Sequence, residues 1–217
     1  KDSDFFFFIW QYQNVEQLGA NITFNTELNS KWTLNTTASF QNYTKDYFST
    51  ERLTWKYDNN DRLFWSRPLN KIYNEQNYGS LQFNLNGEFN TGSIQHKLLL
   101  GADADYATSD SYTYYNPDNN KNYGTSYIYG ANGGSGNLYL DDPSTWESGA
   151  IPNAATLSRN RIPTQRLGVY VQDLISLTDE FKVLAGLRWS YIENKSTKEK
   201  NFKNGTEKKK KNGTSTK

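Results

Sequence analysis

Hydrophobic and polar side chains alternate most regularly in residues 166–193. Side chains of a strand point to opposite faces in turn, so each arm of this stretch has one apolar and one polar face. The apolar positions are Leu167, Val169, Val171, Ile175 and Leu177 in the first arm, and Phe181, Val183, Ala185, Leu187, Trp189 and Tyr191 in the second. Residues 178–180 between the arms read Thr-Asp-Glu, which suits a tight turn. The stretch therefore predicts a long antiparallel hairpin.

Two earlier stretches repeat this pattern, at about residues 18–43 and 78–114. Each contains a short polar turn, at residues 29–31 and 90–93. The apolar positions of the first are Ala20, Ile22, Phe24, Thr26, Leu28, Trp32, Leu34, Thr36, Ala38 and Phe40. Those of the second are Leu81, Phe83, Leu85, Gly87, Phe89, His96, Leu98, Leu100, Ala102, Ala104 and Tyr106. We therefore expect an all-β chain with three hairpins, the last spanning about residues 165–193.

The arms are long enough to cross a lipid bilayer. Each arm of the last hairpin runs for about 11 to 14 residues, whereas strands of globular proteins most often have about 5 to 6. A tilted strand needs about 9 to 11 residues to cross the hydrocarbon core. The arm from Trp32 to Phe40 carries aromatic residues at both ends and smaller ones between, as in the aromatic girdles of membrane barrels. The pattern therefore indicates transmembrane strands.

Three long polar connections alternate with the three tight turns. They cover about residues 44–77, 115–164 and 195–217. Short turns at one end and long loops at the other are typical of bacterial outer-membrane barrels, whose long loops are extracellular. Because the smallest single-chain bacterial barrels have about eight strands, six strands cannot close alone. The chain is predicted to be a partial arc of an antiparallel transmembrane β-barrel.

Composition agrees with a barrel and excludes several other classes. Mean hydropathy is −0.88, yet 16% of the residues are aromatic, a combination that a polar lumen, polar loops and aromatic girdles explain together. No apolar run is long enough for a transmembrane helix. The chain has no cysteine, which excludes disulfides and thiolate metal sites, and its net charge of +1 does not call for nucleic acid.

Both ends suggest a segment of a longer protein. The chain starts at Lys1 without a methionine or a signal peptide, although an outer-membrane protein must be exported. It ends in a lysine-rich tail. We expect the rest of the barrel to be formed by strands outside this segment.

The last hairpin resembles a known family. The run G-V-Y-V-Q-D at residues 168–173, followed by L-x-x-x-F-x-x-L-x-G-L-R-W at residues 177–189, is similar to the barrel hairpin of TonB-dependent siderophore receptors of the ferrichrome type. The resemblance implies a barrel of about 22 strands whose lumen is closed by a plug domain, which this segment does not contain. It also implies active import of a ferric siderophore, driven by TonB and its inner-membrane ExbB/ExbD complex. Iron would enter only within the siderophore, and no other cofactor is implied.

Ligand capture is expected at the extracellular end, on aromatic side chains that can grip a large amphipathic chelate. The candidates share a position in or beside the long connection after residue 110. They are Tyr112, Tyr114, Tyr115, Tyr127, Tyr129 and Trp146.

Catalysis and metal binding find little support. His96 is the only histidine and has the parity of the lipid-facing side chains, so we interpret it as a rim residue without triad or zinc partners. Glu88, Asp103 and Asp105 share the inward face, where acids commonly line a wet lumen. Residues 118–129 begin like a calcium loop but end in tyrosine where a bidentate glutamate is needed. We therefore predict neither an enzyme nor a metal site.

Several alternatives to siderophore import remain open. They are a TonB-dependent importer of another nutrient, a passive porin, an outer-membrane adhesin and a soluble carbohydrate-binding β-protein. The tail from Lys195 onward holds nine lysines and two glutamates, and is expected to be an extracellular loop. Its charge can attract anionic lipopolysaccharide in the outer membrane or an anionic ligand, and the sequence does not decide between them.

Overall fold

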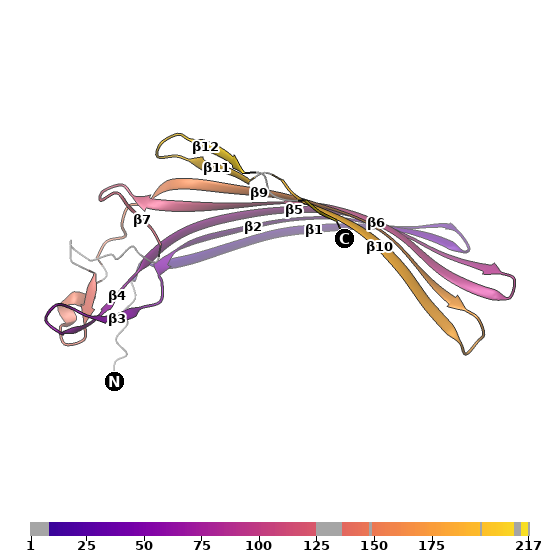
Figure 1. Cartoon of the computed structure of the whole chain (residues 1–217), viewed down its shortest axis with the longest axis horizontal. Helices are drawn as coiled ribbons and strands as arrows, with labels where there is room; N and C mark the ends of the chain where they lie inside the picture. The colour runs from indigo at the N-terminus through magenta and orange to yellow at the C-terminus, as the bar shows by residue number, and fades with distance from the viewer. Residues whose placement is uncertain (1–8, 125–135, 148, 196, 211–213, 217) are drawn as a thin grey trace.

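The structure, a computed structural model, describes residues 9–124, 136–147, 149–195, 197–210 and 214–216. Its main feature is a sheet of six long antiparallel strands that lie side by side in sequence order (Figure 1). These strands are β1 (Tyr12–Asn29), β2 (Trp32–Thr50), β5 (Leu69–Thr91), β6 (Ile94–Asn116), β9 (Ala155–Ser176) and β10 (Lys182–Asn194). The all-β antiparallel fold predicted from the alternation is confirmed.

One face of this sheet is apolar across all six strands. A single rung of paired residues runs through Phe24, Thr36, Phe83, Ala102, Val169 and Trp189. Large side chains of this face are exposed, with Ile22 at 73% and Leu187 at 76%. A broad exposed apolar face needs an apolar phase to cover it, and the hydrocarbon core of a bilayer supplies one. We refer to it below as the lipid-facing side.

The protein core is small. In the described part of the chain the buried hydrophobic residues are Phe48, Phe64, Leu69, Tyr123 and Leu138. Three of these, Phe48, Leu69 and Tyr123, form one cluster at the end of the sheet opposite the tight turns. The long strands therefore owe little to a protein interior of their own.

The strands extend further than the sequence pattern predicts. Strands β5 and β6 each contain 23 residues, and at about 3.4 Å per residue they reach about 78 Å, more than twice the bilayer core of about 30 Å. Residues 44–50, 69–77 and 155–164, which were predicted to belong to polar connections, instead continue β2, β5 and β9. Above the membrane no lipid requires one face of a strand to be apolar, so the regular alternation disappears while the backbone ladder continues.

The two longer connections meet in a separate small sheet. Strands β3 (Thr54–Tyr57), β4 (Leu63–Ser66) and β8 (Asn137–Tyr139) pair in that order, and the 3-10 helix η2 (Pro143–Trp146) follows (Figure 1). Arg67, 1% exposed, directs its guanidinium toward the carbonyl oxygens of Thr145, Trp146 and Glu147 at 3.1–3.4 Å. This buried arginine fastens the second connection to the first.

The lysine-rich tail contains strands rather than a plain loop. Strand β11 (Thr197–Asn201) pairs with both β9 and β12 (Glu207–Lys210), and β13 (Thr214–Thr216) pairs with β10. Strand β7 (Lys121–Asn122) pairs with β6. None of the helical segments described is long and apolar enough to cross a membrane.

Two glycines of the long sheet make room for large neighbours. A Cβ atom on Gly101 would lie 2.0 Å from the ring of Tyr170, and one on Gly87 would lie 2.4 Å from the ring of Trp32. The Tyr170 hydroxyl is held from the far side, because it donates to Asn84 and accepts from Gln82. The ring therefore has little freedom to move away from Gly101.

Replacing Gly101 with alanine is expected to destabilise the sheet by about 1–3 kcal/mol, because overpacking forces a held ring out of place. Urea unfolding of the detergent-solubilised protein measures this effect. Gly19→Ala is the matched control, since a Cβ there would meet only a carbonyl oxygen at 3.7 Å. Equal stability of the two variants would contradict the expectation.

Candidate ligand path and extracellular surfaces

The face of the sheet opposite the lipid-facing side is polar and cross-linked by ion pairs. Arg188 on β10 donates to both carboxylate oxygens of Asp103 on β6, at 2.8 and 2.9 Å. Arg166 on β9 donates to Asp105 on β6 at 2.8 Å. Both aspartates are thus held by arginines, an arrangement that lines a polar wall and does not resemble a pair of catalytic carboxylates.

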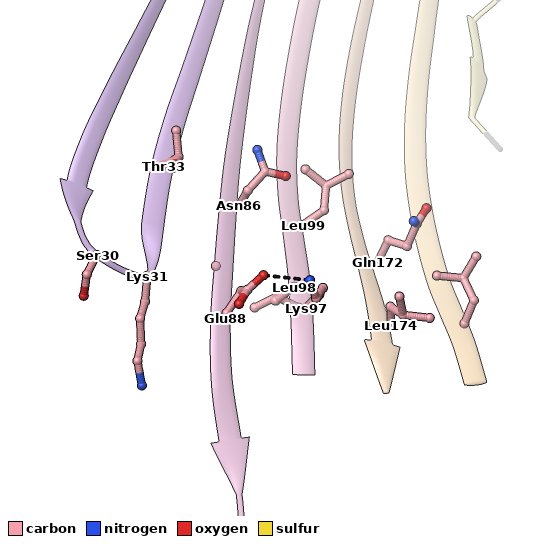
Figure 2. A pocket seen from close by; sticks show the side chains of 12 residues that line it. Ser30, Lys31, Thr33, Asn86, Glu88, Lys97, Leu98, Leu99, Gln172 and Leu174 are labelled. Atoms are coloured by element: carbon pink, nitrogen blue, oxygen red, sulfur yellow. Dashed lines mark ion pairs between the residues drawn. The ribbon is translucent and has the colours of Figure 1, made fainter. Parts of the chain in front are cut away.

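A recess of about 740 Å³ lies on this polar face near the tight turns (Figure 2). Figure 2 shows the ion pair of 2.9 Å between Glu88 and Lys97 in this recess. Lys97 is six residues before Asp103 on β6. Its lining also includes Leu99, Leu174 and Leu184, and Leu184 is 62% exposed. An exposed leucine group inside an otherwise polar surface marks a place where another part of a protein can pack.

A second recess, of about 400 Å³, lies further along the polar face toward the long connections. Its lining side chains include Gln41, Tyr43, Gln76, Tyr78 and Arg166. They offer amide, hydroxyl and guanidinium groups, and the one cation among these five is paired with Asp105. Sequence reasoning missed this site, because its residues sit at the edges of the predicted hairpins, where no motif marks them.

The tyrosines predicted to bind ligand do not form one site. Tyr112 has the parity of the lipid-facing residues and contacts Tyr73, with ring centroids 5.3 Å apart. Tyr114 packs against the buried cluster of Phe48, and burial raises the pKa of its hydroxyl to about 12. Tyr115 lies under the ammonium group of Lys203, 5.1 Å from the ring centroid.

The remaining candidates lie elsewhere. Trp146 is part of the small extracellular sheet, where its indole N–H donates to the carbonyl oxygen of Tyr139 at 2.8 Å. Tyr127 and Tyr129 fall outside the described residues. The same holds for most of the aromatic run at residues 5–10, of which only Ile9 and Trp10 are described.

The structure exposes a different aromatic pair. Trp55 and Tyr57 on β3 are 65% and 60% exposed, and their rings meet edge to face with centroids 6.1 Å apart. Both lie on the small sheet, which an ion pair of 2.7 Å between Arg62 and Asp141 also stabilises. The hydrogen bond from Arg62 lowers the pKa of the Asp141 carboxyl. Trp55 and Tyr57 are two residues apart in the sequence, which puts them on one face of a strand. They lie within residues 44–77, which we interpreted as a polar connection.

A family comparison decides what kind of protein carries these surfaces. The family model described as "TonB dependent receptor-like, beta-barrel" matches residues 1–217. The chain belongs to this family. It is therefore part of an outer-membrane β-barrel receptor rather than an enzyme, which confirms the predicted localisation and the predicted lack of catalysis.

Three solved structures share the fold of this chain. The siderophore receptor PiuA of Acinetobacter baumannii aligns with a TM-score of 0.59 and 18% identity over 95% of this chain and 29% of its own. BauA, the ferric preacinetobactin receptor of the same organism, aligns with a TM-score of 0.59 and 18% identity over 97% of this chain and 28% of its own. The ferric citrate transporter FecA aligns with a TM-score of 0.56 and 11% identity over 92% of this chain and 23% of its own. The chain thus spans less than a third of these receptors, and no curated protein matches it.

The structure gives His96 two neighbours on the sheet. Its Nδ1 lies 2.7 Å from a carboxylate oxygen of Asp173, and its ring stacks on Phe89 with centroids 4.7 Å apart. Sequence reasoning had found no partner for His96, because Asp173 is 77 residues away and reaches it only through the β6–β9 pairing. Within the described residues, no group of three or more acidic or histidine side chains is arranged to hold a metal ion.

Proposed function

We propose that this chain is part of a receptor that imports a ferric siderophore across the outer membrane in a TonB-dependent manner. The observation that carries the proposal is the polar, ion-paired face, with its two recesses, in a chain of this receptor family. The similar solved structures are named as a siderophore receptor, the ferric preacinetobactin receptor and the ferric citrate transporter. The complete barrel is proposed to have about 22 strands around a plug domain.

The described surfaces suggest a path for the ligand. Trp55 and Tyr57 offer exposed rings for first capture at the extracellular end, together with Tyr115 and the other tyrosines proposed from the sequence. The recess around Tyr43 and Tyr78 then lies on the way along the polar face. It suits a neutral chelate of the ferrichrome type, because its arginine is already paired with a carboxylate.

The recess near the turns suits contact with the plug domain. Leu99, Leu174 and Leu184 can pack against an apolar plug surface, and the ion pair of Glu88 with Lys97 can exchange partners with it. TonB and the ExbB/ExbD complex are the proposed partners that rearrange the plug. This division places ligand contacts at the extracellular end and plug contacts at the periplasmic end.

A TonB-dependent importer of another nutrient is the second candidate. The polar recess favours it as much as a siderophore receptor, because amide and hydroxyl groups also bind other polar ligands. Family membership favours these two candidates over a soluble carbohydrate-binding protein, an adhesin and a passive porin.

Uptake of radioactive iron tests the proposal. Iron-limited cells that express the receptor are supplied with individual ferric siderophores, and cells lacking TonB serve as the comparison. TonB-dependent accumulation of at least one ferric siderophore is expected. Uptake of a non-iron nutrient with no response to any siderophore would favour the second candidate.

Replacing both Trp55 and Tyr57 with alanine is expected to weaken ligand binding about tenfold or more, since each exposed aromatic contact contributes about 0.5–1.5 kcal/mol beyond its buried area. Titration of the receptor with the transported siderophore, followed by fluorescence, measures the dissociation constant. Phe202→Ala is the control, because this exposed aromatic lies on β11's neighbouring turn and not on the small sheet. An unchanged dissociation constant in the double variant would remove the pair from the ligand path.

A further inference from the structure

The polar face of the long sheet is divided into an uncharged half on β1, β2 and β5 and a charged half on β6, β9 and β10. Residues directly opposite each other in an antiparallel pair share one face, so a rung can be followed across all six strands. One rung of this face runs through Thr23, Thr37, Gln82, Asp103, Gly168 and Ser190. The next rung toward the tight turns carries its charge at Arg188 on β10, and the next rung toward the long connections carries its charges at Asp105 on β6 and Arg166 on β9. In these rungs, which the structure describes completely, β1, β2 and β5 contribute no charged side chain.

The side chains of the uncharged half bind one another. The hydroxyl groups of Thr23 and Thr37 lie 3.3 Å apart, and the Asn35 side-chain amide donates to the side-chain oxygen of Asn25. Neutral hydrogen bonds contribute little net free energy, because water readily replaces either partner. A plug domain that rests against this half can therefore separate from it at low cost.

The charged half offers stronger contacts. Arg188 donates to Ser190 and to both carboxylate oxygens of Asp103, and Arg166 donates to Asp105. A guanidinium has more N–H donors than these bonds use, so both arginines keep donors for a further partner. The side chain of Arg188 is 47% exposed and that of Arg166 is 46% exposed. A hydrogen bond from an arginine is about twice as strong as one between neutral groups, so a plug domain separates from this half at a higher cost.

The uncharged half joins the two recesses. The recess of about 400 Å³ includes Gln41 and Tyr78, which share one rung, and the recess of about 740 Å³ includes Thr33 and Asn86, which share another (Figure 2). Gln41 is eight residues beyond Thr33 on β2, or about 27 Å along the strand. The inward side chains between these rungs on β2 and β5 are all amides or hydroxyls, namely Asn35, Thr37, Ser39, Ser80, Gln82 and Asn84. A molecule that moves between the recesses along β2 and β5 therefore meets no charged side chain of the wall.

The other route between these levels, along β6 and β9, is charged. It passes Asp105 with Arg166, and then Asp103 with the guanidinium of Arg188. Gly168 lies under this second pair, since a Cβ atom there would be 2.1 Å from Arg188 and 2.9 Å from Asp103. Transport requires a ligand to bind well enough to enter and weakly enough to leave. Paired charges along this route would retain a polar ligand.

We propose that the ligand passes from the recess near Gln41 to the recess near Thr33 along β2 and β5. The plug domain separates from the barrel there and keeps its contact with the charged half. Amides and hydroxyls both donate and accept hydrogen bonds, so they replace the water around a polar chelate as it moves. This inference rests on the proposed import function, but not on the identity of the nutrient.

Single introduced thiols test this route. The variants are Thr37→Cys on β2 and Ser190→Cys on β10, which lie on one rung of the polar face. Each native hydroxyl has one neighbouring side chain as its partner, Thr23 for Thr37 and Arg188 for Ser190, so the two substitutions are matched. The chain has no cysteine of its own, and the wild-type receptor gives the background labelling.

The probe is a charged, membrane-impermeant methanethiosulfonate reagent added to intact, iron-limited cells. The medium contains the ferric siderophores of the uptake experiment. The labelling rate at each position is compared between cells with and without TonB, so that differences in basal accessibility cancel. Protease resistance of the unlabelled variants checks that both receptors are folded, and Ser39→Cys, on the same half, replaces Thr37→Cys if that variant is not.

The labelling rate of Thr37→Cys is expected to be about tenfold higher with TonB, because an opening that breaks a neutral instead of a charge-assisted hydrogen bond is favoured by about that factor. The rate of Ser190→Cys is expected to change less than about twofold, because the plug stays against the charged half. A rise for Ser190→Cys as large as that for Thr37→Cys would overturn this route and leave TonB-dependent import standing. A lack of TonB dependence at both positions would overturn the route and the proposed function together.

Discussion

Replacing Arg67 with methionine is expected to release residues 143–147 from the small extracellular sheet and to abolish ligand capture there. Methionine replaces the aliphatic part of the side chain but leaves three carbonyl oxygens without the guanidinium. Losing a buried charged donor with several acceptors costs about 3–5 kcal/mol. The long sheet shares none of these contacts and is expected to stay folded.

Limited proteolysis of intact cells detects this release as a new cleavage between residues 137 and 147. Uptake of the transported ligand, measured on the same cells, is expected to fall in parallel. Arg62→Met is the matched control, because its partner Asp141 is at the surface, where water screens the ion pair. Protease resistance equal to the wild type in the Arg67 variant would show that other contacts hold this sheet.

Replacing Asp110 with alanine is expected to destabilise the upper part of the long sheet by about 2–3 kcal/mol. The carboxylate is 1% exposed and lies between Arg159 and Arg161, whose charges would repel each other without it. Breaking a fully buried ion pair costs about 3–5 kcal/mol. The loss expected at Asp110 is smaller, because about a third of each arginine side chain is exposed to water.

Urea unfolding in detergent measures the loss at Asp110. Glu88→Ala provides the comparison, because Glu88 pairs with Lys97 at 2.9 Å while both side chains are about half exposed. That variant is expected to lose less than about 1 kcal/mol. A loss at Glu88 as large as that at Asp110 would mean that burial does not set the strength of these pairs.

The lipid-facing strands were predictable because a bilayer imposes its pattern on every residue of a crossing strand. Lipid contact requires apolar side chains at Leu167, Val169 and Val171, but not at Gly168 and Gln172. The alternation therefore predicted both the strand and which of its faces meets lipid. The tight turn at residues 178–180 then fixed the pairing of β9 with β10. The family resemblance rested on the same hairpin, and the family model extends it to the whole chain.

Above the membrane this information disappears. Apart from Phe48 and Leu69, which pack in the buried cluster, residues 44–50 and 69–77 are mostly polar, so no regular alternation separates strand from loop there. An exposed polar strand forms wherever a neighbouring backbone offers hydrogen bonds. Which strand pairs with it depends on the register of the whole sheet. The role of the chosen aromatic residues in ligand binding stays a prediction. The sequence could not show that Tyr112, Tyr114 and Trp146 lie in different parts of the structure.

The sequence by itself determined that six apolar-faced strands cross a membrane in hairpins, because period-2 alternation is a local property of the chain. The tertiary structure alone decided which distant residues meet. Three contacts show this: Asp110 and Arg159 are 49 residues apart in the sequence, His96 and Asp173 are 77 apart, and Arg67 and Glu147 are 80 apart. Such pairs depend on the register of whole strands and on the path of long connections. The local alternation of side chains determines neither of these.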